Sequence, residues 1–196
     1  PPPPPPPFFF QAQHAIRDAQ ESRGLGDVYK RQDHRAAGEL RGMKGDIYDG
    51  GHRIPHIVKW PGKIKAGSKN HIPNTLASFY STIADLLNLD STAIDSYSIF
   101  SQLVSDIKKE TYQPIIHHTS EGHFAIRQGD WKMIEKLGSG GFSLPKTVKP
   151  KPGVRQERLY NMREDLSEQI NLAEDYPKII TEMKFKLDSI RSISMN

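Results

Sequence analysis

One lysine directly precedes a glycine in the segment 40–64, which reads LRGMKGDIYDGGHRIPHIVKWPGKI. This lysine is Lys44, and the glycine pair Gly50-Gly51 follows it. A lysine ammonium that is held in place can stabilise negative charge that develops during a reaction. Gly45 would let the backbone turn sharply, and the glycine pair would let the chain bend or let other backbone approach closely. By residue type alone, however, Lys44 is a solvated surface lysine, the ordinary fate of most lysines.

Histidine is the second residue type here that could do chemistry. His117, His118 and His123 lie close together, and two more histidines, His52 and His56, follow the glycine pair. Imidazole groups can bind metals or transfer protons. Neighbouring residues on a strand point to opposite faces, so His117 and His118 could not jointly bind one ion from one side. We therefore expect one of the two to be inward and hydrogen-bonded and the other to be exposed.

The composition excludes several classes of site. The chain has 196 residues, no cysteine and a formal net charge of +4. Disulfides, thiol nucleophiles and cysteine-based zinc sites are therefore excluded. The lysines and arginines are scattered and form no basic stripe interleaved with aromatic residues, so nucleic-acid binding is not expected. No apolar run approaches the ~20 residues that span a bilayer, so no membrane span is expected.

Residues 1–32 do not resemble a segment that folds. Pro1–Phe10 is what a run of C followed by a run of T would encode, and residues 11–18 resemble the translation of a sequencing-library adapter. We interpret residues 1–32 as an artefact or disordered segment and exclude them from the fold prediction. The alternative is a proline-rich linker or a ligand for a partner, because consecutive prolines form a stiff polyproline II rod.

Two elements are expected in the first part of the remaining chain. Residues 54–60 form a β-branched run that Pro61-Gly62 ends, which predicts a mostly buried strand followed by a turn. Residues 74–89 predict an amphipathic helix with Asn74 or Thr75 as its cap. Its apolar stripe consists of Leu76, Phe79, Tyr80, Ile83, Leu86 and Leu87.

The second part of the chain predicts a small antiparallel sheet. A short strand begins at Pro114, a hairpin spans 123–136 with its turn at Gln128-Gly129-Asp130, and a further strand covers 158–162. The Gly-, Pro- and Lys-rich residues 137–156 predict a long loop. A final helix begins near Pro177 and buries Ile179, Ile180, Met183, Leu187 and Ile190. The fold class is therefore α/β, with the last elements of a large mixed sheet plus a small antiparallel sheet packed on a C-terminal helix.

Four segments in order resemble one enzyme family. KGDIYDGGHRIP at 44–55 resembles the pattern K-G-x-x-[YW]-[ED]-G-G-x-R-x-P of the formylglycine-dependent sulfatases. DHRAAGELRGMKG at 33–45 is similar to the approach to that lysine, and FAIRQGDWKMIEKLGSGGFS at 124–143 resembles the arylsulfatase C-terminal hairpin and its loop. LYNMREDLSEQINLAEDYP at 159–177 resembles the closing segment of the family. The order of the four makes the resemblance specific.

The resemblance implies a C-terminal fragment of an arylsulfatase-like sulfuric ester hydrolase of the alkaline-phosphatase-like superfamily. Lys44 would contact the sulfate, because cleavage of the S–O bond places negative charge on the leaving oxygen. Asp49 and Arg53 are interpreted as architectural, an acid and a base that pair nearby. His118 would contact the substrate, since the C-terminal subdomain of the family often supplies such contacts. Residues 33–105 would end the catalytic α/β domain, and 106–196 would form the C-terminal subdomain.

The resemblance also implies cofactors for the parent enzyme. Its formylglycine is made from a C/S-x-P-S-R motif, and its calcium is held by an acidic pair near the N-terminus and an Asp-Asn pair upstream of the lysine segment. None of these is in this sequence. We therefore predict that this polypeptide alone does not turn over sulfate esters and that its exposed apolar faces promote aggregation. The parent is expected to be extracellular, periplasmic or lysosomal.

Two alternatives remain open at this stage. A phosphohydrolase of the same superfamily would use a related scaffold. A noncatalytic module could bind sulfated glycans through the hairpin and the lysine-rich segment Lys146–Lys151, although a solvated loop also explains those lysines. The substrate class is equally open, because aryl sulfates, glycosaminoglycan sulfates and algal polysaccharide sulfates all fit the resemblance.

Overall fold

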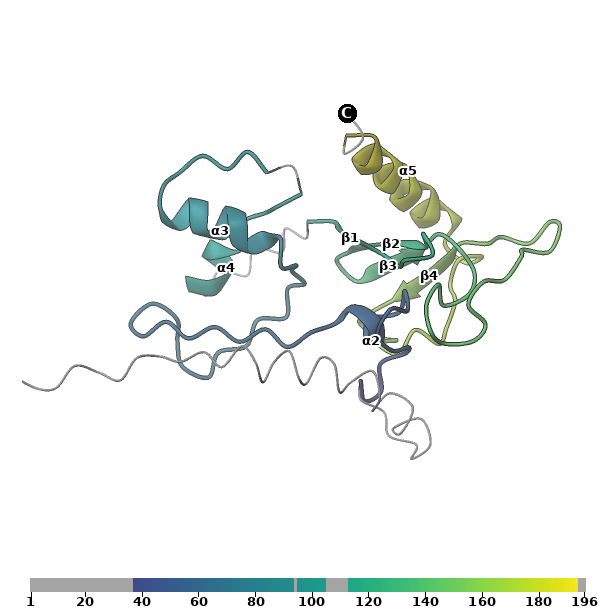
Figure 1. Cartoon of the computed structure of the whole chain (residues 1–196), viewed down its shortest axis with the longest axis horizontal. Coiled ribbons are helices and arrows are strands. Elements are labelled where there is room, and N and C mark those ends of the chain that lie inside the picture. Colours follow the sequence, from purple (N-terminus) through teal and green to yellow (C-terminus); the bar gives the residue numbers. More distant parts are fainter. Residues whose placement is uncertain (1–36, 94, 105–112, 194–196) are drawn as a thin grey trace, which may run out of the picture. The chain divides into compact units, whose positions relative to one another are not determined.

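The computed structural model describes residues 37–93, 95–104 and 113–193 (Figure 1). The chain divides into two units, Pro1–Gly38 and Glu39–Asn196, and every element below belongs to the second. The expected artefact at 1–32 lies outside the described residues. So does the predicted boundary between residues 105 and 106.

A four-stranded antiparallel sheet organises the C-terminal half of the second unit. Its strands follow one another in the order β1-β2-β3-β4. In β2 and β3 the hairpin register pairs Gln128 with Trp131, and Gly129 in the two-residue turn has a φ of 57°. The predicted strands and the turn are thus confirmed, and residues 137–156 form a loop without helix or strand. The strands are β1 (Ile115–His118), β2 (Phe124–Gln128), β3 (Trp131–Ile134) and β4 (Arg158–Asn161).

The helix α5 (Pro177–Ile193) packs on one face of this sheet, as predicted (Figure 1). Alternate strand residues point toward it, because side chains on a strand alternate between faces. The buried cluster between sheet and helix consists of Ile126, Met133, Leu159, Ala173, Ile180, Met183 and Leu187. Ile179 packs against this cluster and Ile190 is half-buried, so the predicted apolar face of the helix is confirmed.

The opposite face of the sheet is covered by the segment that contains Lys44. Ile47 and Tyr48, just before the one-turn helix α2 (Asp49–His52), are buried against Ala125, Ile134 and Tyr160 of the strands. The motif segment is therefore also part of a hydrophobic core. This arrangement fixes the turn of Lys44 to the sheet.

The predicted helix near residue 80 is present as α3 (Ser78–Leu86), followed by α4 (Phe100–Val104). Its cap is Ala77, without a side-chain hydrogen bond, and not the predicted Asn74 or Thr75. The helix buries a polar face: the Ser81 amide donates to Ser96 Oγ at 3.0 Å. The hydroxyl face thus packs on the following segment, and the predicted apolar stripe is left exposed, with Ile83 53% exposed.

The predicted strand at 54–60 is wrong. These residues form no helix or strand, and Ile57 is 91% exposed. No strand within the described ranges runs beside them, so the ladder of backbone hydrogen bonds that defines a strand is not formed. The expected large mixed sheet is likewise not found in the described part of the chain, whereas the α/β class and the small sheet with its helix are confirmed. The described helices include none with the length and apolar character needed to cross a membrane.

Candidate functional site

Lys44 lies at the exposed tip of a tight turn. The Asp46 amide donates to the Met43 carbonyl at 2.9 Å, and the Met43 amide donates to Asp46 Oδ2 at 2.9 Å. Gly45 has a φ of 89°, a left-handed conformation that side chains disfavour, so the predicted sharp turn is confirmed. Within the described residues, Lys44 forms no ion pair. Its ammonium is therefore available to an external anion.

The buried carboxylate of Asp46 anchors this turn to the loop at 139–143. Ser143 donates twice to it, from its amide to Oδ1 at 3.0 Å and from its hydroxyl to Oδ2 at 2.5 Å. The Ile47 amide also donates to the Ser139 carbonyl at 2.8 Å. Hydrogen bonds to an ionised carboxylate are stronger than neutral ones. The position of the Lys44 turn is thus fixed from two sides.

Close backbone approach explains two of the glycines. A Cβ on Gly51 would lie 2.3 Å from the Asp46 carbonyl oxygen, and one on Gly141 would lie 2.3 Å from the Gly45 carbonyl oxygen. Both distances are shorter than real Cβ contacts, so a side chain at either position would displace the turn. The sequence predicted either a bend of the chain or the close approach of other backbone at Gly50-Gly51, and the close approach is confirmed at Gly51.

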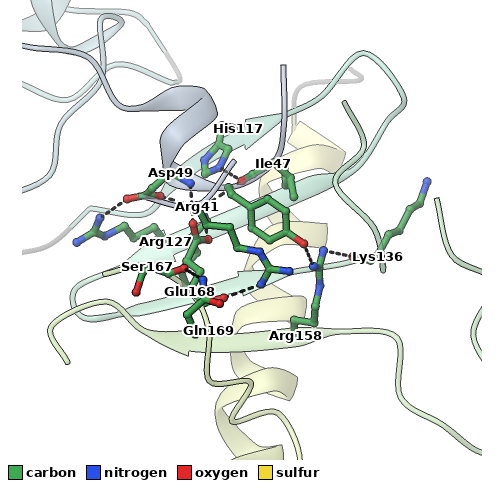
Figure 2. A network of polar contacts seen from close by, with 12 residues as sticks. Arg41, Ile47, Asp49, His117, Arg127, Lys136, Arg158, Ser167, Glu168 and Gln169 are labelled. Atoms are coloured by element: carbon green, nitrogen blue, oxygen red, sulfur yellow. Dashed lines mark hydrogen bonds and ion pairs between the residues drawn. The ribbon is translucent and has the colours of Figure 1, made fainter. Parts of the chain in front are cut away.

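A buried ion-pair cluster lies next to Ile47 and Asp49, and Figure 2 shows its members Asp49, Arg127 and Glu168. Lys132 of β3 is fully buried, and its Nζ lies 2.8 Å from Asp49 Oδ1 and 2.7 Å from Glu168 Oε1. It also donates to the Ile47 carbonyl at 3.1 Å. Glu168 in turn accepts from the Asp49 amide at 2.7 Å. The cluster joins α2, the sheet and the segment after β4 in one polar contact.

The partners of Asp49 correct one prediction. Asp49 forms ion pairs with Lys132 and, at 3.3 Å, with Arg127 of β2. The exposed side chain of Arg53 forms no ion pair with Asp49 within the described residues, although its charge helps to lower the pKa of Asp49, and an architectural role for Asp49 is supported. Burial would raise the pKa of Asp49, but the charges of Lys132 and Arg127 hold that pKa below its usual value.

His117 and His118 divide between the two faces of the sheet, as predicted. His117 Nε2 lies 3.2 Å from the Ile47 carbonyl oxygen, and its ring centroid lies 4.2 Å from that of His52. Burial, together with the charge of Lys132, lowers the pKa of His117 to about 3. His118 is exposed, with its Nδ1 3.0 Å from the Thr119 carbonyl oxygen.

The two predicted site residues are not brought together. The ring of His118 lies beside that of Phe124, with centroids 5.1 Å apart, and Phe124 packs on the cluster under α5. His118 is thus on the α5 face, whereas the Lys44 segment covers the other face. His117 is the histidine that reaches the Lys44 segment.

Comparisons with known proteins point to one family. The chain is 29% identical over 164 residues to an N-acetylgalactosamine-6-O-sulfatase of Bacteroides thetaiotaomicron. This alignment covers 81% of this chain and 31% of that protein. It is also 30% identical over 98 residues to an arylsulfatase of Hemicentrotus pulcherrimus, in an alignment that covers 47% of this chain and 17% of that protein. This chain is homologous to sulfatases. No family model matches it.

A solved structure agrees with this sulfatase homology. It comes from Bacteroides thetaiotaomicron, is described under the metabolism of multiple glycosaminoglycans, and matches with a TM-score of 0.64 and 28% identity. The match covers 79% of this chain and 32% of that one. The sulfatase homologue thus spans about a third, or less, of the length of each of these proteins.

The described residues of this sulfatase homologue do not form a calcium site. No group of three or more His, Asp or Glu side chains with metal-binding geometry occurs among them. Asp49 and Glu168 are already paired with Lys132, and Asp46 accepts hydrogen bonds from Ser143.

Sequence reasoning missed the buried cluster. Lys132 and Glu168 were not singled out, although Ile134, two positions after Lys132 on the same face of β3, is buried. A charged residue at an inward position is a signal, because lysine is almost never fully buried without a partner. The identity of that partner, Glu168, could not be found from spacing.

Proposed function

We propose that this chain is the C-terminal part of a sulfatase, an enzyme that hydrolyses sulfate esters, and that Lys44 contacts the sulfate group of the substrate. The observation behind this proposal is the similarity to a named sulfatase over 81% of the chain. The exposed Lys44 on a turn held by Asp46 adds a chemical reason.

The role of Lys44 follows from the charge of the reaction. A sulfate ester is an anion, and cleavage of its S–O bond moves more negative charge onto the leaving oxygen. An ammonium group that is already in position stabilises that charge without reorganising during the reaction. The buried Asp46 carboxylate and the Gly51 and Gly141 contacts provide this positioning. The lysine is thus an electrostatic group and not a nucleophile in this proposal.

Two groups of the proposed enzyme would come from outside this chain. The formylglycine implied by the family would supply the attacking group, and calcium would neutralise substrate charge. The C/S-x-P-S-R motif is not in this sequence, and the described residues contain no calcium site. We accordingly assign to this chain the binding and positioning of the sulfate alone. We also place the parent in an extracellular, periplasmic or lysosomal compartment, as in the family that the motifs resemble.

The substrate class favoured by the comparisons is a sulfated sugar. The relative with the longest alignment described above is named for N-acetylgalactosamine 6-sulfate, and this sugar is the first substrate to test. His118 remains a proposed substrate contact, on the face of the sheet away from the Lys44 segment. Neither the phosphohydrolase nor the noncatalytic glycan-binding module is favoured by the relatives, which are named as sulfatases.

The test begins with the locus upstream of Asp33. The reading frame there should continue into an Asp-Asn pair and a C/S-x-P-S-R motif, and the encoded enzyme should hydrolyse a sulfate ester faster than the matching phosphate ester. In that enzyme Lys44→Met should lower kcat/KM by about 10²- to 10³-fold. Lys63→Met, which removes another exposed lysine, should leave it unchanged. A native message that begins with the proline run, or equal activity of the two variants, would contradict the proposal.

A further inference from the structure

An exposed aromatic ring lies directly beside the Lys44 turn. Phe142 is 61% exposed. A Cβ built on Gly45 would lie 3.1 Å from Cε2 and 3.2 Å from Cδ2 of this ring. The ring edge therefore rests on the bare backbone of the residue that follows Lys44. Single exposed apolar residues are common on protein surfaces, so the ring must be judged by how it is held and by what lies next to it.

The loop holds Phe142 in one place. On its N-terminal side the Gly141 amide donates to Ser139 Oγ at 3.1 Å, and on its C-terminal side Ser143 donates to the buried Asp46 carboxylate. The Ser139 hydroxyl also donates to the Ser143 carbonyl at 2.5 Å, which closes the loop around Phe142. Side chains presented by a preorganised loop lose little entropy when they bind. The loop thus exposes an apolar ring at a fixed position, although burial elsewhere would be more favourable for the ring.

Lys44 and Phe142 together match one kind of ligand. Binding sites for small molecules combine apolar or aromatic surface with a few placed polar groups. Here the polar group is an ammonium without an ion-pair partner in the described part of the chain, and the apolar group is a ring against the next residue. Inorganic sulfate would use only the first. A sulfate joined to a ring would use both.

We propose that Phe142 is a specificity-determining residue that packs against the ring to which the sulfate ester is attached, while Lys44 binds the sulfate. This inference rests on the function proposed above and adds one residue to it: Phe142 would contact the ring, of a sugar or an aryl group, that carries the sulfate. Phe142 makes no contact with the S–O bond in this proposal. It therefore changes the affinity for ring-bearing esters and not the recognition of sulfate.

The test is an NMR titration of the full 196-residue chain. The three probes are inorganic sulfate, N-acetylgalactosamine 6-sulfate and 4-nitrophenyl sulfate, and the observed signals are the backbone amides of Gly45 and Ser143. At least one of the two ring esters should bind more tightly than inorganic sulfate. Phe142→Ala should weaken binding of the esters by about three- to tenfold, the range of an aromatic contact, and leave binding of inorganic sulfate unchanged.

Matched variants separate the ring from the fold. Phe142→Tyr keeps an aromatic ring and should retain ester binding. This result would attribute the weaker binding of Phe142→Ala to the lost ring. Phe185→Ala removes another exposed phenylalanine, 75% exposed on α5, and should change nothing. A preference for only one of the two esters identifies the ring as sugar or aryl, and both results support the inference.

The failures of the two proposals differ. If Lys44→Met weakens binding of all three probes but Phe142→Ala weakens none, the Phe142 inference is overturned and the sulfate contact of Lys44 stands. If Phe142→Ala weakens inorganic sulfate as strongly as the esters, the ring is not the cause and the inference also falls. If Lys44→Met leaves inorganic sulfate binding unchanged, or if no probe shifts the Gly45 signal, the sulfate contact itself is refuted together with the inference.

Discussion

Replacing Lys132 with methionine tests the buried ion-pair cluster that contacts Ile47 and Asp49. Methionine fills a similar volume without the charge, so the change removes the ion pairs to Asp49 and Glu168 while the sheet keeps its packing. The two carboxylates are not affected equally. Asp49 keeps Arg127 at 3.3 Å, whereas the side chain of Glu168, which is fully buried, keeps the Asp49 amide as its one partner among the described residues. The unfavourable charge should therefore concentrate on Glu168.

The expected loss of stability is large. Removing one partner of a buried pair costs about 3–5 kcal/mol, because the other charge is left without compensation. A domain of this size has a free energy of unfolding of about 5–15 kcal/mol, so Lys132→Met removes a substantial fraction of it. Protonation would relieve Glu168, and burial already raises the pKa of this carboxyl. The destabilisation should thus be smaller at about pH 5 than at about pH 7.

Urea unfolding followed by tryptophan fluorescence measures this loss, because Trp131 lies in β3 beside Tyr176, with ring centroids 5.1 Å apart. The control is Lys186→Met on α5, a partly exposed lysine that donates to Gln128 at 2.6 Å, and it should cost less than about 1 kcal/mol. Adding Glu168→Gln to Lys132→Met should restore at least about half of the loss. A loss below about 1 kcal/mol, or a double variant that is less stable than Lys132→Met, would refute the reasoning.

Three further predictions concern other parts of the chain. The folded pKa of His117 is about 3 against an ordinary value of 6.5, so the unfolded state binds the extra proton and stability falls as pH drops from 6.5 toward 3. His117→Gln should reduce the slope of the unfolding free energy against pH by up to ~1.4 kcal/mol per pH unit in that window. The charged or titratable neighbours of His117, which are Lys132, His52 and Asp49, stay the same in this variant. An unchanged slope would contradict the assignment. Gly141→Ala, whose Cβ would lie 2.3 Å from the Gly45 carbonyl oxygen, should destabilise the chain by ~2 kcal/mol or more in the same urea assay and shift the Gly45 amide signal, whereas Gly153→Ala, which meets nothing within 4 Å, should leave that signal in place. The purified segment 33–196 should show no turnover of 4-nitrophenyl sulfate, and measurable turnover would show that the chemistry needs no formylglycine.

The small sheet could be predicted because its signals are local. Alternating apolar residues on both sides of Gln128-Gly129-Asp130 specify the hairpin, and Pro177 with the apolar spacing after it specifies α5. Turn chemistry and periodicity act over a few residues, so sequence spacing is enough to find them. The sharp turn at Gly45 could also be predicted from local sequence.

The remaining features depend on contacts between distant residues. Residues 54–60 have the composition of a strand, but a strand exists only beside a partner that completes its hydrogen bonds. In α3 the apolar stripe was recognised from the sequence, yet it is exposed and the polar residues Ser81 and Thr82 are buried. The Ser81 amide donates to Ser96 Oγ, and the Ile99 amide donates to Thr82 Oγ1. Pattern analysis identifies which face of a helix is apolar. Whether that face is covered depends on neighbours that spacing does not reveal.

The candidate site shows the same division between local and distant signals. The resemblance pointed to Lys44, and the glycines around it were correctly linked to a tight turn. The residues that hold this turn in place are Asp46 and the loop residues Ser139 and Ser143, which lie more than 90 positions further along the chain than the turn. The side of the sheet toward α5 is an apolar core, whereas the other side joins an apolar cluster to buried charges that contact Ile47 and Asp49, a few residues after Lys44. A lysine that must meet an anion without moving needs such a support, because a flexible side chain on a mobile turn would lose entropy on every binding event. In the proposed function the buried cluster acts through the position of Lys44, so we expect Lys132→Met to weaken sulfate binding without any contact between Lys132 and the ligand.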